Sequence, residues 1–113
     1  MVTGDLAIET SQASAEWRIG VTGRLAIESS AHLRGLLMKA IRNGTCAVLI
    51  IDLSGISYLD TSGVATLLEA AQVASGQAVR LRVVGLSGEP RMLAQIAEID
   101  RIFRAYGSEA ELT

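Results

Sequence analysis

The chain has 113 residues, half of them hydrophobic, and only four residues are aromatic. The sequence contains ten lysine and arginine residues and twelve aspartate and glutamate residues, so the formal net charge is −2. This composition excludes a disordered chain, because the apolar surface is large enough to offset the conformational entropy lost on folding. It also argues against a nucleic-acid-binding protein, which would show a basic excess or aromatic stacking platforms. We therefore expect one globular domain.

We expect no segment of this sequence to direct the protein out of the cytoplasm or into a membrane. Its single cysteine, Cys46, cannot form an internal disulfide, which favours a reducing intracellular compartment. Residues 1–5 lack the basic segment and apolar core of a secretory signal. The apolar run from Ala47 to Ile51 is far shorter than the ~20 residues that span a bilayer. We predict a soluble cytoplasmic protein without membrane insertion.

The first third of the chain predicts two strands and one helix. Residues 6–10 and 17–22 alternate between apolar and polar side chains, as half-buried strands do. Over residues 29–41 the apolar side chains recur at helical spacing. Ser29 or Ser30 is the expected N-cap of this helix.

The middle third predicts a buried strand followed by a second helix. Residues 46–53 show no polar side chain before Asp52, which indicates a strand buried on both faces, inside a sheet covered by helices. A turn is expected at Ser54-Gly55. Helical spacing then extends over residues 62–75, with Glu69 facing water.

The last third predicts a strand at residues 79–83 and a helix that begins at Pro90 and directs Ile96 inward. An edge strand at residues 102–106 and a turn of helix at residues 108–112 are expected to complete the chain. The order β-β-α-β-α-β-α-β predicts an α/β sandwich. It would contain a single mixed sheet of about five strands, with helices packed on it and right-handed crossovers.

Few residues support catalysis. His32, the only histidine, lies early in the first predicted helix, and no Asp or Glu is spaced to form a metal site with it. Cys46 opens an apolar strand, so we interpret it as a small buried hydrophobe rather than a nucleophile. The sequence contains no glycine-rich phosphate-binding pattern. We predict that the protein is not an enzyme and uses no cofactor and no metal.

The stretch from Leu53 to Gly63 leads from the buried strand to a helix that begins with Asp60-Thr61-Ser62-Gly63. The start of a helix presents unpaired N–H groups and a partial positive charge, so it tolerates an anion. A phosphate on a hydroxyl there would add about −1.5 to −2 charges to the surface that a partner meets. Taken alone, however, these residues predict only an ordinary helix start with Asp60 or Thr61 as the N-cap.

The ordered pattern of the chain resembles the STAS domain, typified by bacterial anti-sigma-factor antagonists. The resemblance covers roughly residues 6–112, so residues 1–113 would form a single STAS domain. Its most specific part runs from residue 48 to residue 63. The segments that carry it are Val21-Thr-Gly23, Val48-Leu-Ile-Ile-Asp-Leu-Ser-Gly55, Tyr58-Leu-Asp-Thr-Ser-Gly63, Leu81-Arg-Val-Val-Gly-Leu86 and Ile99-Asp-Arg-Ile-Phe103.

The resemblance implies a phosphorylation switch. In the family, the Ser or Thr after the Asp accepts phosphate from a serine/threonine protein kinase of the histidine-kinase-like ATPase type, which is also the anti-sigma factor. That role falls on Thr61, with Ser62 as the alternative. The unphosphorylated form would bind the kinase and free the sigma factor, and the phosphorylated form would release the kinase. The implied partner-binding residues are Gly23, Arg24, Asp60, Thr61, Ser62, Gly63 and Thr66.

Two features depart from the switching members of the family. Those members often carry acidic residues in the early segment, as in Gly-Glu-Leu-Asp, whereas this chain has Gly23-Arg24-Leu25-Ala26. Their phosphoacceptor is also Ser more often than Thr. The family therefore offers an alternative, a non-switching STAS subunit that regulates a lipid-transport ABC system, an anion transporter or a larger signalling complex. A small enzyme or nucleotide-binding α/β protein is a third hypothesis, for which the sequence shows no binding cradle.

Overall fold

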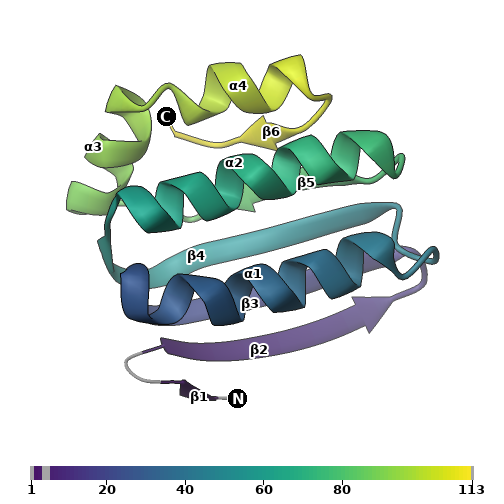
Figure 1. Ribbon diagram of the computed structural model, residues 1–113, viewed down its shortest axis with the longest axis horizontal. Coiled ribbons are helices and arrows are strands. Elements are labelled where there is room, and N and C mark those ends of the chain that lie inside the picture. Colours follow the sequence, from purple (N-terminus) through teal and green to yellow (C-terminus); the bar gives the residue numbers. More distant parts are fainter. Residues whose placement is uncertain (1, 4–5, 113) are drawn as a thin grey trace.

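The computed structural model describes residues 2–3 and 6–112, and its strands form one mixed sheet (Figure 1). The strands lie side by side in chain order. β1, β2 and β3 are antiparallel, whereas β3, β4, β5 and β6 run parallel to one another. Their bounds are β1 Val2–Thr3, β2 Leu6–Ala13, β3 Glu16–Leu25, β4 Val48–Leu59, β5 Arg80–Val84 and β6 Glu109–Ala110. The predicted α/β fold with a single mixed sheet is confirmed.

Two long helices, α1 (Ile27–Arg42) and α2 (Thr61–Gly76), lie side by side across one face of the sheet (Figure 1). The Arg34 guanidinium on α1 donates two hydrogen bonds to the Glu69 carboxylate on α2, at 2.7 and 2.6 Å. Glu69 was predicted to face water, but it is half-buried in an ion pair between the two helices. Two shorter helices, α3 (Gly88–Ile96) and α4 (Ile99–Ala105), follow β5. Among the described residues, no helix has the length and apolar character needed to cross a membrane.

The core lies between the sheet and the helices and consists mainly of Leu, Ile, Val and Ala side chains. Phe103 is the one aromatic side chain among the buried residues of the described chain. Cys46 is also buried, its thiol donates to the Val48 carbonyl oxygen at 3.4 Å, and burial raises the pKa of the thiol. The interpretation of Cys46 as a small buried hydrophobe is confirmed.

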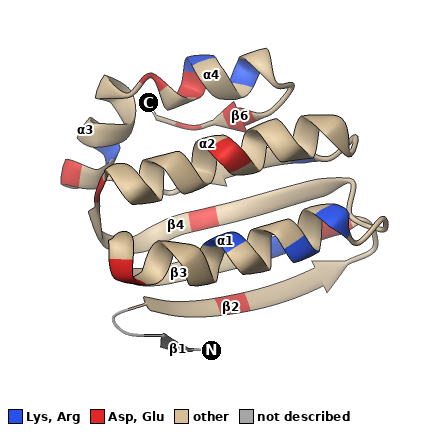
Figure 2. Ribbon diagram, in the orientation of Figure 1, with Lys and Arg blue, Asp and Glu red and all other residues tan. Residues whose placement is uncertain are grey.

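The opposite face of the sheet is charged rather than covered by the long helices. Ile50 on β4 is nevertheless buried there, because its neighbours in register are Arg18 on β3 and Arg82 on β5, whose aliphatic stems flank it. Arg18 forms an ion pair with Asp52 at 2.9 Å, and Arg82 pairs with Glu109 at 2.9 Å. Figure 2 shows that acidic and basic residues are interspersed over the fold. On this face Val48 and Asp52 are only partly buried, so the predicted burial of β4 on both faces holds only at Ile50, where flanking arginines replace the expected helices.

β4 is longer than the sequence predicts. The turn expected at Ser54-Gly55 is wrong, because the strand continues to Leu59. A Cβ on Gly55 would lie 2.0 Å from the Thr22 Cγ2 of the neighbouring strand, so glycine permits a close approach of two strands here. The register between β3 and β4 shifts at this place, between Gly20 and Thr22. The glycine marks a strand irregularity and not a chain reversal.

The secondary structure predicted near the C-terminus is reversed in the fold. The expected edge strand at residues 102–106 is wrong, because this segment belongs to helix α4, in which Ile99 and Phe103 are buried one turn apart. The turn of helix expected at residues 108–112 is also wrong, because strand β6 lies there. The hydroxyl of buried Ser108 accepts a hydrogen bond from the Leu81 N–H at 2.9 Å and fixes this edge.

Two further details of the helices differ from prediction. Neither Ser29 nor Ser30 is the N-cap of α1, because the helix starts earlier and Ala26 holds that position. The Ser29 hydroxyl reaches back instead and accepts from the Ala26 N–H at 3.1 Å. Ile96 was expected to point inward but is 77% exposed, whereas Pro90 and Ala94 are the buried residues of α3.

Candidate functional site

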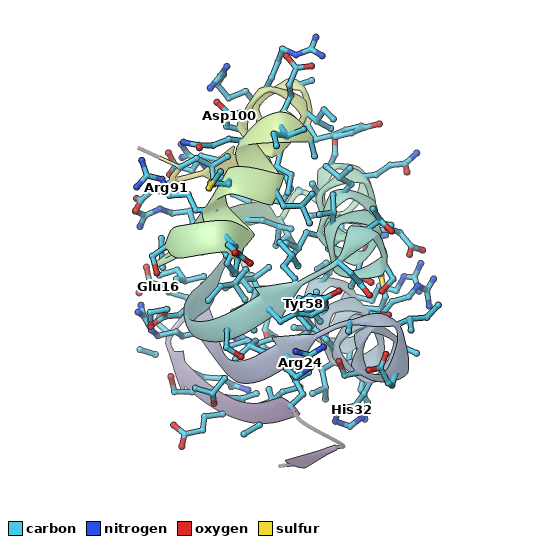
Figure 3. All side chains as sticks on the ribbon, turned by 90° about the vertical axis from the view of Figure 1, so that its left-hand side faces the viewer. Glu16, Arg24, His32, Tyr58, Arg91 and Asp100 are labelled. Carbon is cyan, nitrogen blue, oxygen red and sulfur yellow. The ribbon has the colours of Figure 1, made fainter. Side chains whose placement is uncertain are left out.

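Four segments meet at one end of the molecule, which faces the viewer in Figure 3: the ends of β3 and β4 and the starts of α1 and α2. The Asp60 carboxylate joins them. Its Oδ1 accepts from the backbone N–H groups of Ser62 at 3.0 Å and Gly63 at 3.1 Å, at the start of α2. Its Oδ2 accepts from the Ile27 N–H at 3.1 Å, at the start of α1. Asp60 is the N-cap of α2, as predicted, and it also caps α1 from outside that helix.

These hydrogen bonds keep the Asp60 carboxylate ionised. The Ser62 hydroxyl, which donates to Oδ1 at 2.6 Å, makes the largest contribution to lowering the pKa of Asp60. The backbone N–H groups of Gly63, Ile27 and Ser62 lower this pKa further, and desolvation opposes them. A fixed negative charge therefore lies directly before Thr61.

The lowered pKa of Asp60 makes part of the stability dependent on pH. The ordinary pKa of an aspartate in an unfolded chain is about 3.9, and the folded chain releases this proton more readily. The contribution of the ionised carboxylate is thus present above the unfolded pKa and is lost as the pH falls through the folded pKa. We expect the difference in unfolding free energy between wild type and Asp60→Asn to shrink on acidification below about pH 4. Urea denaturation across this range checks it, and a difference that stays constant or grows would contradict it.

The two candidate phosphoacceptors have different surroundings. Thr61 is exposed, and its hydroxyl forms no hydrogen bond with any other residue that the structure describes. Ser62 is half-buried, and its hydroxyl is engaged with Asp60. A modifying enzyme could reach the Thr61 hydroxyl without breaking an existing hydrogen bond, whereas reaction at Ser62 would disrupt the cap.

Gly63 and Thr66 do not lie on the surface on which partner-binding residues were expected. Both are buried, and the Thr66 hydroxyl donates to the Ser62 carbonyl oxygen at 3.0 Å within α2. A Cβ on Gly63 would lie 2.6 Å from the Leu59 Cδ1 and 3.0 Å from the Leu25 carbonyl oxygen. These two residues therefore position the start of α2 against the sheet instead of presenting a side chain to a partner.

This close approach predicts that Gly63→Ala is destabilising, although alanine is the better helix former. Overpacking lowers the free energy of unfolding by about 1–3 kcal/mol, and the higher helix propensity of alanine offsets about 1 kcal/mol of this loss. Gly35 in α1 is the matched control, because a Cβ there meets nothing within 4 Å. We expect Gly35→Ala to raise the unfolding free energy by about 0.5–1 kcal/mol. Chemical denaturation of both variants checks the pair, and stabilisation by Gly63→Ala would contradict the account.

A cation beside this site is held in place by an aromatic ring. The Arg24 guanidinium lies 4.1 Å from the centroid of the Tyr58 ring, and the two residues are paired in register on β3 and β4 (Figure 3). Gly23 precedes it with a φ of 105°, and the Gly23 carbonyl oxygen accepts from the Ser57 hydroxyl at 3.2 Å. Arg24, Asp60, Thr61 and Ser62 are thus brought to one end of the fold.

Sequence reasoning missed a set of exposed apolar side chains. Ile27, Tyr58, Met92 and Ile96 are the large hydrophobic side chains that stand exposed in the described part of the chain. They come from the start of α1, the end of β4 and from α3, which Figure 1 shows at the same end of the molecule. The spacing of Met92 and Ile96, one helical turn apart, was the available signal, but it equally fits a core-facing stripe. Exposed large apolar side chains at one end of a molecule are candidate contacts for a protein partner.

His32 is the remaining residue that was considered for catalysis or metal binding. His32 is half-buried on α1, one turn after the helix start. Within residues 6–112, no three or more His, Cys, Asp or Glu side chains gather in a way that could hold a metal ion. The absence of a cofactor and of enzymatic activity stays a prediction.

Solved structures with the same fold include anti-sigma factor antagonists. The unphosphorylated form of the antagonist SpoIIAA is 19% identical, with a TM-score of 0.75 over 93% of this chain and 88% of that chain. The phosphorylated form of the Bacillus cell fate determinant SpoIIAA is 19% identical, with a TM-score of 0.69 over 93% and 91%. An anti-sigma factor antagonist from Mycobacterium paratuberculosis is 14% identical, with a TM-score of 0.73 over 89% and 86%. At these identities the likeness establishes the fold.

Comparison with the curated proteins found no match. The model of one protein family, described as the STAS domain, matches residues 11–112 and so spans nearly the whole chain. The matched range contains the end of β2, the sheet from β3 onward, and all four helices, including the start of α2 with its Asp60 cap. The chain belongs to the STAS domain family.

Proposed function

We propose that the protein is an anti-sigma-factor antagonist whose docking is controlled by phosphorylation of Thr61. It binds a kinase-type anti-sigma factor when Thr61 is unmodified and releases it when Thr61 carries a phosphate. The observation that carries this proposal is the Thr61 hydroxyl, which is exposed and free of hydrogen bonds to the described residues. It stands at the start of α2, at the same end of the molecule as the exposed side chains of Ile27 and Tyr58.

Docking of the unmodified protein uses that apolar surface. Burial of Ile27, Met92 and Ile96 against a partner supplies a favourable free energy of about 25 cal/mol for each Å² of apolar area removed from water. Arg24, held over Tyr58, adds a cation that favours an acidic group on the partner. The Asp60 carboxylate joins the start of α2 to the start of α1, so a partner that docks on Ile27 would also cover the Thr61 hydroxyl.

Phosphorylation reverses docking by changing charge without unfolding the domain. A phosphate adds about −1.5 to −2 charges next to the ionised Asp60. The start of α2 tolerates an anion, because its N–H groups and dipole favour negative charge. In the complex, however, the same charge must be desolvated or must face the partner, which is costly. The fold therefore persists while affinity falls.

The partner implied by this function is a serine/threonine protein kinase of the histidine-kinase-like ATPase type, acting in the bacterial cytoplasm. The protein itself contributes a docking surface and a phosphoacceptor, and no catalytic group. Nucleic acid takes no part in the contact.

Phosphotransfer tests the proposal. The protein is incubated with each histidine-kinase-like ATPase encoded in the same genome and with Mg-ATP, and its intact mass is measured. We expect one phosphoryl group on wild type and on Ser62→Ala, and none on Thr61→Ala. The absence of a mass gain on wild type with every such ATPase, or an undiminished gain on Thr61→Ala, would contradict the proposal.

Arg24 favours a second candidate function, that of a non-switching subunit, and an experiment should distinguish the two. Switching members of the family often carry an acidic residue where this chain has Arg24, so a non-switching subunit of a transporter or signalling complex would also fit. Such a subunit would bind its partner ATPase with equal affinity whether or not Mg-ATP is present. Arg24→Glu distinguishes the two functions. The glutamate that it introduces should increase the rate of phosphotransfer to Thr61 if the protein is a switching antagonist, and should have no such effect in a non-switching subunit.

A further inference from the structure

The outer edge of β2 is covered only at its start, where the short strand β1 pairs with Leu6 and Ala7 (Figure 1). From Glu9 to Ala13, β2 pairs with β3 on its inner side, and no described residue pairs with its outer side. All five residues of this stretch are exposed. They present a row of unpaired backbone N–H and C=O groups, which is a template for a further strand.

This open edge lacks the features that keep sheet edges from pairing with other chains. Those features are a short strand, a lysine or proline on the edge, or a bulge. β2 has eight residues, its only charged residue is Glu9, it contains no proline, and its register with β3 is continuous. The edge strand β6 is protected by comparison, because it has two residues and Arg82 forms ion pairs with Glu109 and Glu111 beside it.

A groove beside the open edge leaves room for an added strand. It has a volume of about 430 Å³ and is lined by Ile8, Glu9, Thr10 and Leu36. Leu36, which is half-buried on α1, forms its apolar wall. The described part of the chain therefore does not block the approach of a second strand to this edge.

Charge indicates how a second copy of β2 fits this edge. Two copies related by a twofold axis run antiparallel, and opposite residues point to the same face, so the pair is centred on one residue. Centred on Thr10, the pair places Glu9 opposite Ser11 of the second copy, which is itself paired with Arg18. Centred on Glu9, it brings two carboxylates together, and centred on Ser11, it places Glu9 opposite the residue paired with Glu16. Of these three registers, the one centred on Thr10 avoids like charges.

We propose that the protein forms a symmetric homodimer in which β2 pairs antiparallel with β2 of a second copy, centred on Thr10. The two sheets join into one continuous sheet, and the strand of the second copy fills the groove beside Leu36. Thr61 stands on α2, and α1 lies between α2 and this edge (Figure 1). The dimer contact is therefore separate from Thr61 and does not depend on the function proposed for it.

The same substitution at two adjacent exposed residues tests the dimer and its register. Sedimentation velocity at protein concentrations up to about 1 mM measures the dimer dissociation constant. Thr10→Lys places two ammonium groups opposite each other and should raise this constant about fivefold. Ser11→Lys places each ammonium group opposite a Glu9 carboxylate and should lower the constant about two- to fivefold. Circular dichroism verifies the fold of both variants.

Disulfide cross-linking tests the register independently, because the only native cysteine, Cys46, is buried. Thr10→Cys puts two thiols at opposite positions, with Cα atoms about 5 Å apart, and should give a disulfide-linked dimer on mild oxidation. Gln12→Cys is the control, because its two copies lie about 13 Å apart along the strands and should stay unlinked. Intact mass under non-reducing conditions measures both. A wild-type chain that stays monomeric at every concentration, equal effects of the two lysine variants, or equal cross-linking of the two cysteine variants would overturn the proposal.

Discussion

Replacing Asp60 with alanine is expected to lower the free energy of unfolding by about 2–3 kcal/mol, because one carboxylate caps two helices. For a domain of this size the melting temperature should fall by about 10 °C. Loss of the cap leaves backbone N–H groups of Ile27, Ser62 and Gly63 without this acceptor. Thermal and urea denaturation, followed by circular dichroism, measure the effect.

Ser87 supplies the matched control for the Asp60 variant. It is the N-cap of α3, but its hydroxyl makes no capping hydrogen bond. Ser87→Ala should therefore change the unfolding free energy by less than about 0.5 kcal/mol. Asp60→Asn should lie between alanine and wild type, since an amide oxygen also caps helices. Equal effects of Asp60→Ala and Ser87→Ala would contradict the role of Asp60 as a double cap.

Thr61→Glu is expected to weaken binding to the kinase-type partner about 10- to 100-fold while leaving the fold intact. The added carboxylate lies next to ionised Asp60 and must be desolvated on docking. Thr61→Gln is the control, because it has the same size without the charge and should retain most of the affinity. Isothermal titration calorimetry measures the affinities, and far-ultraviolet circular dichroism verifies the fold.

Comparison of Thr61→Glu with Thr61→Gln distinguishes the effect of charge on affinity from the effect of side-chain size at residue 61. Equal loss of affinity in Thr61→Glu and Thr61→Gln would show that size, and not charge, disturbs docking. Unchanged affinity in Thr61→Glu would place residue 61 outside the contact surface and contradict the proposed switch.

Much of the fold was predictable from periodicity, because most elements bury one face. The alternation in β3, the apolar run in β4 and the helical spacing in α1 and α2 all lead to the observed sheet and its two long helices. Ends and irregularities were not predictable in this way. Gly55 looks like a turn signal in the sequence, yet it allows β4 to pass close to Thr22. Ile99 and Phe103 belong to a helix because tertiary packing, not local alternation, determines which face is buried.

The candidate site was predictable only in part. The tetrapeptide from Asp60 to Gly63 indicates a helix start, and the structure confirms Asp60 as its cap. That Asp60 also caps α1 depends on a contact between residues 33 positions apart, which no local pattern contains. The burial of Thr66 and the exposure of Ile96 likewise depend on how helices pack against the rest of the molecule. Thr61 and Ser62 could be distinguished as candidate phosphoacceptors only once the hydrogen bonds of their hydroxyl groups were known.

The central claim is that one phosphate on Thr61 controls docking, and the affinity of one partner for two forms of the same protein tests it most directly. The wild-type protein is titrated into its kinase-type ATPase with ADP, at one ionic strength, before and after phosphorylation. We predict that the unphosphorylated form binds at least about tenfold more tightly. Equal affinities, or tighter binding of the phosphorylated form, would contradict the account.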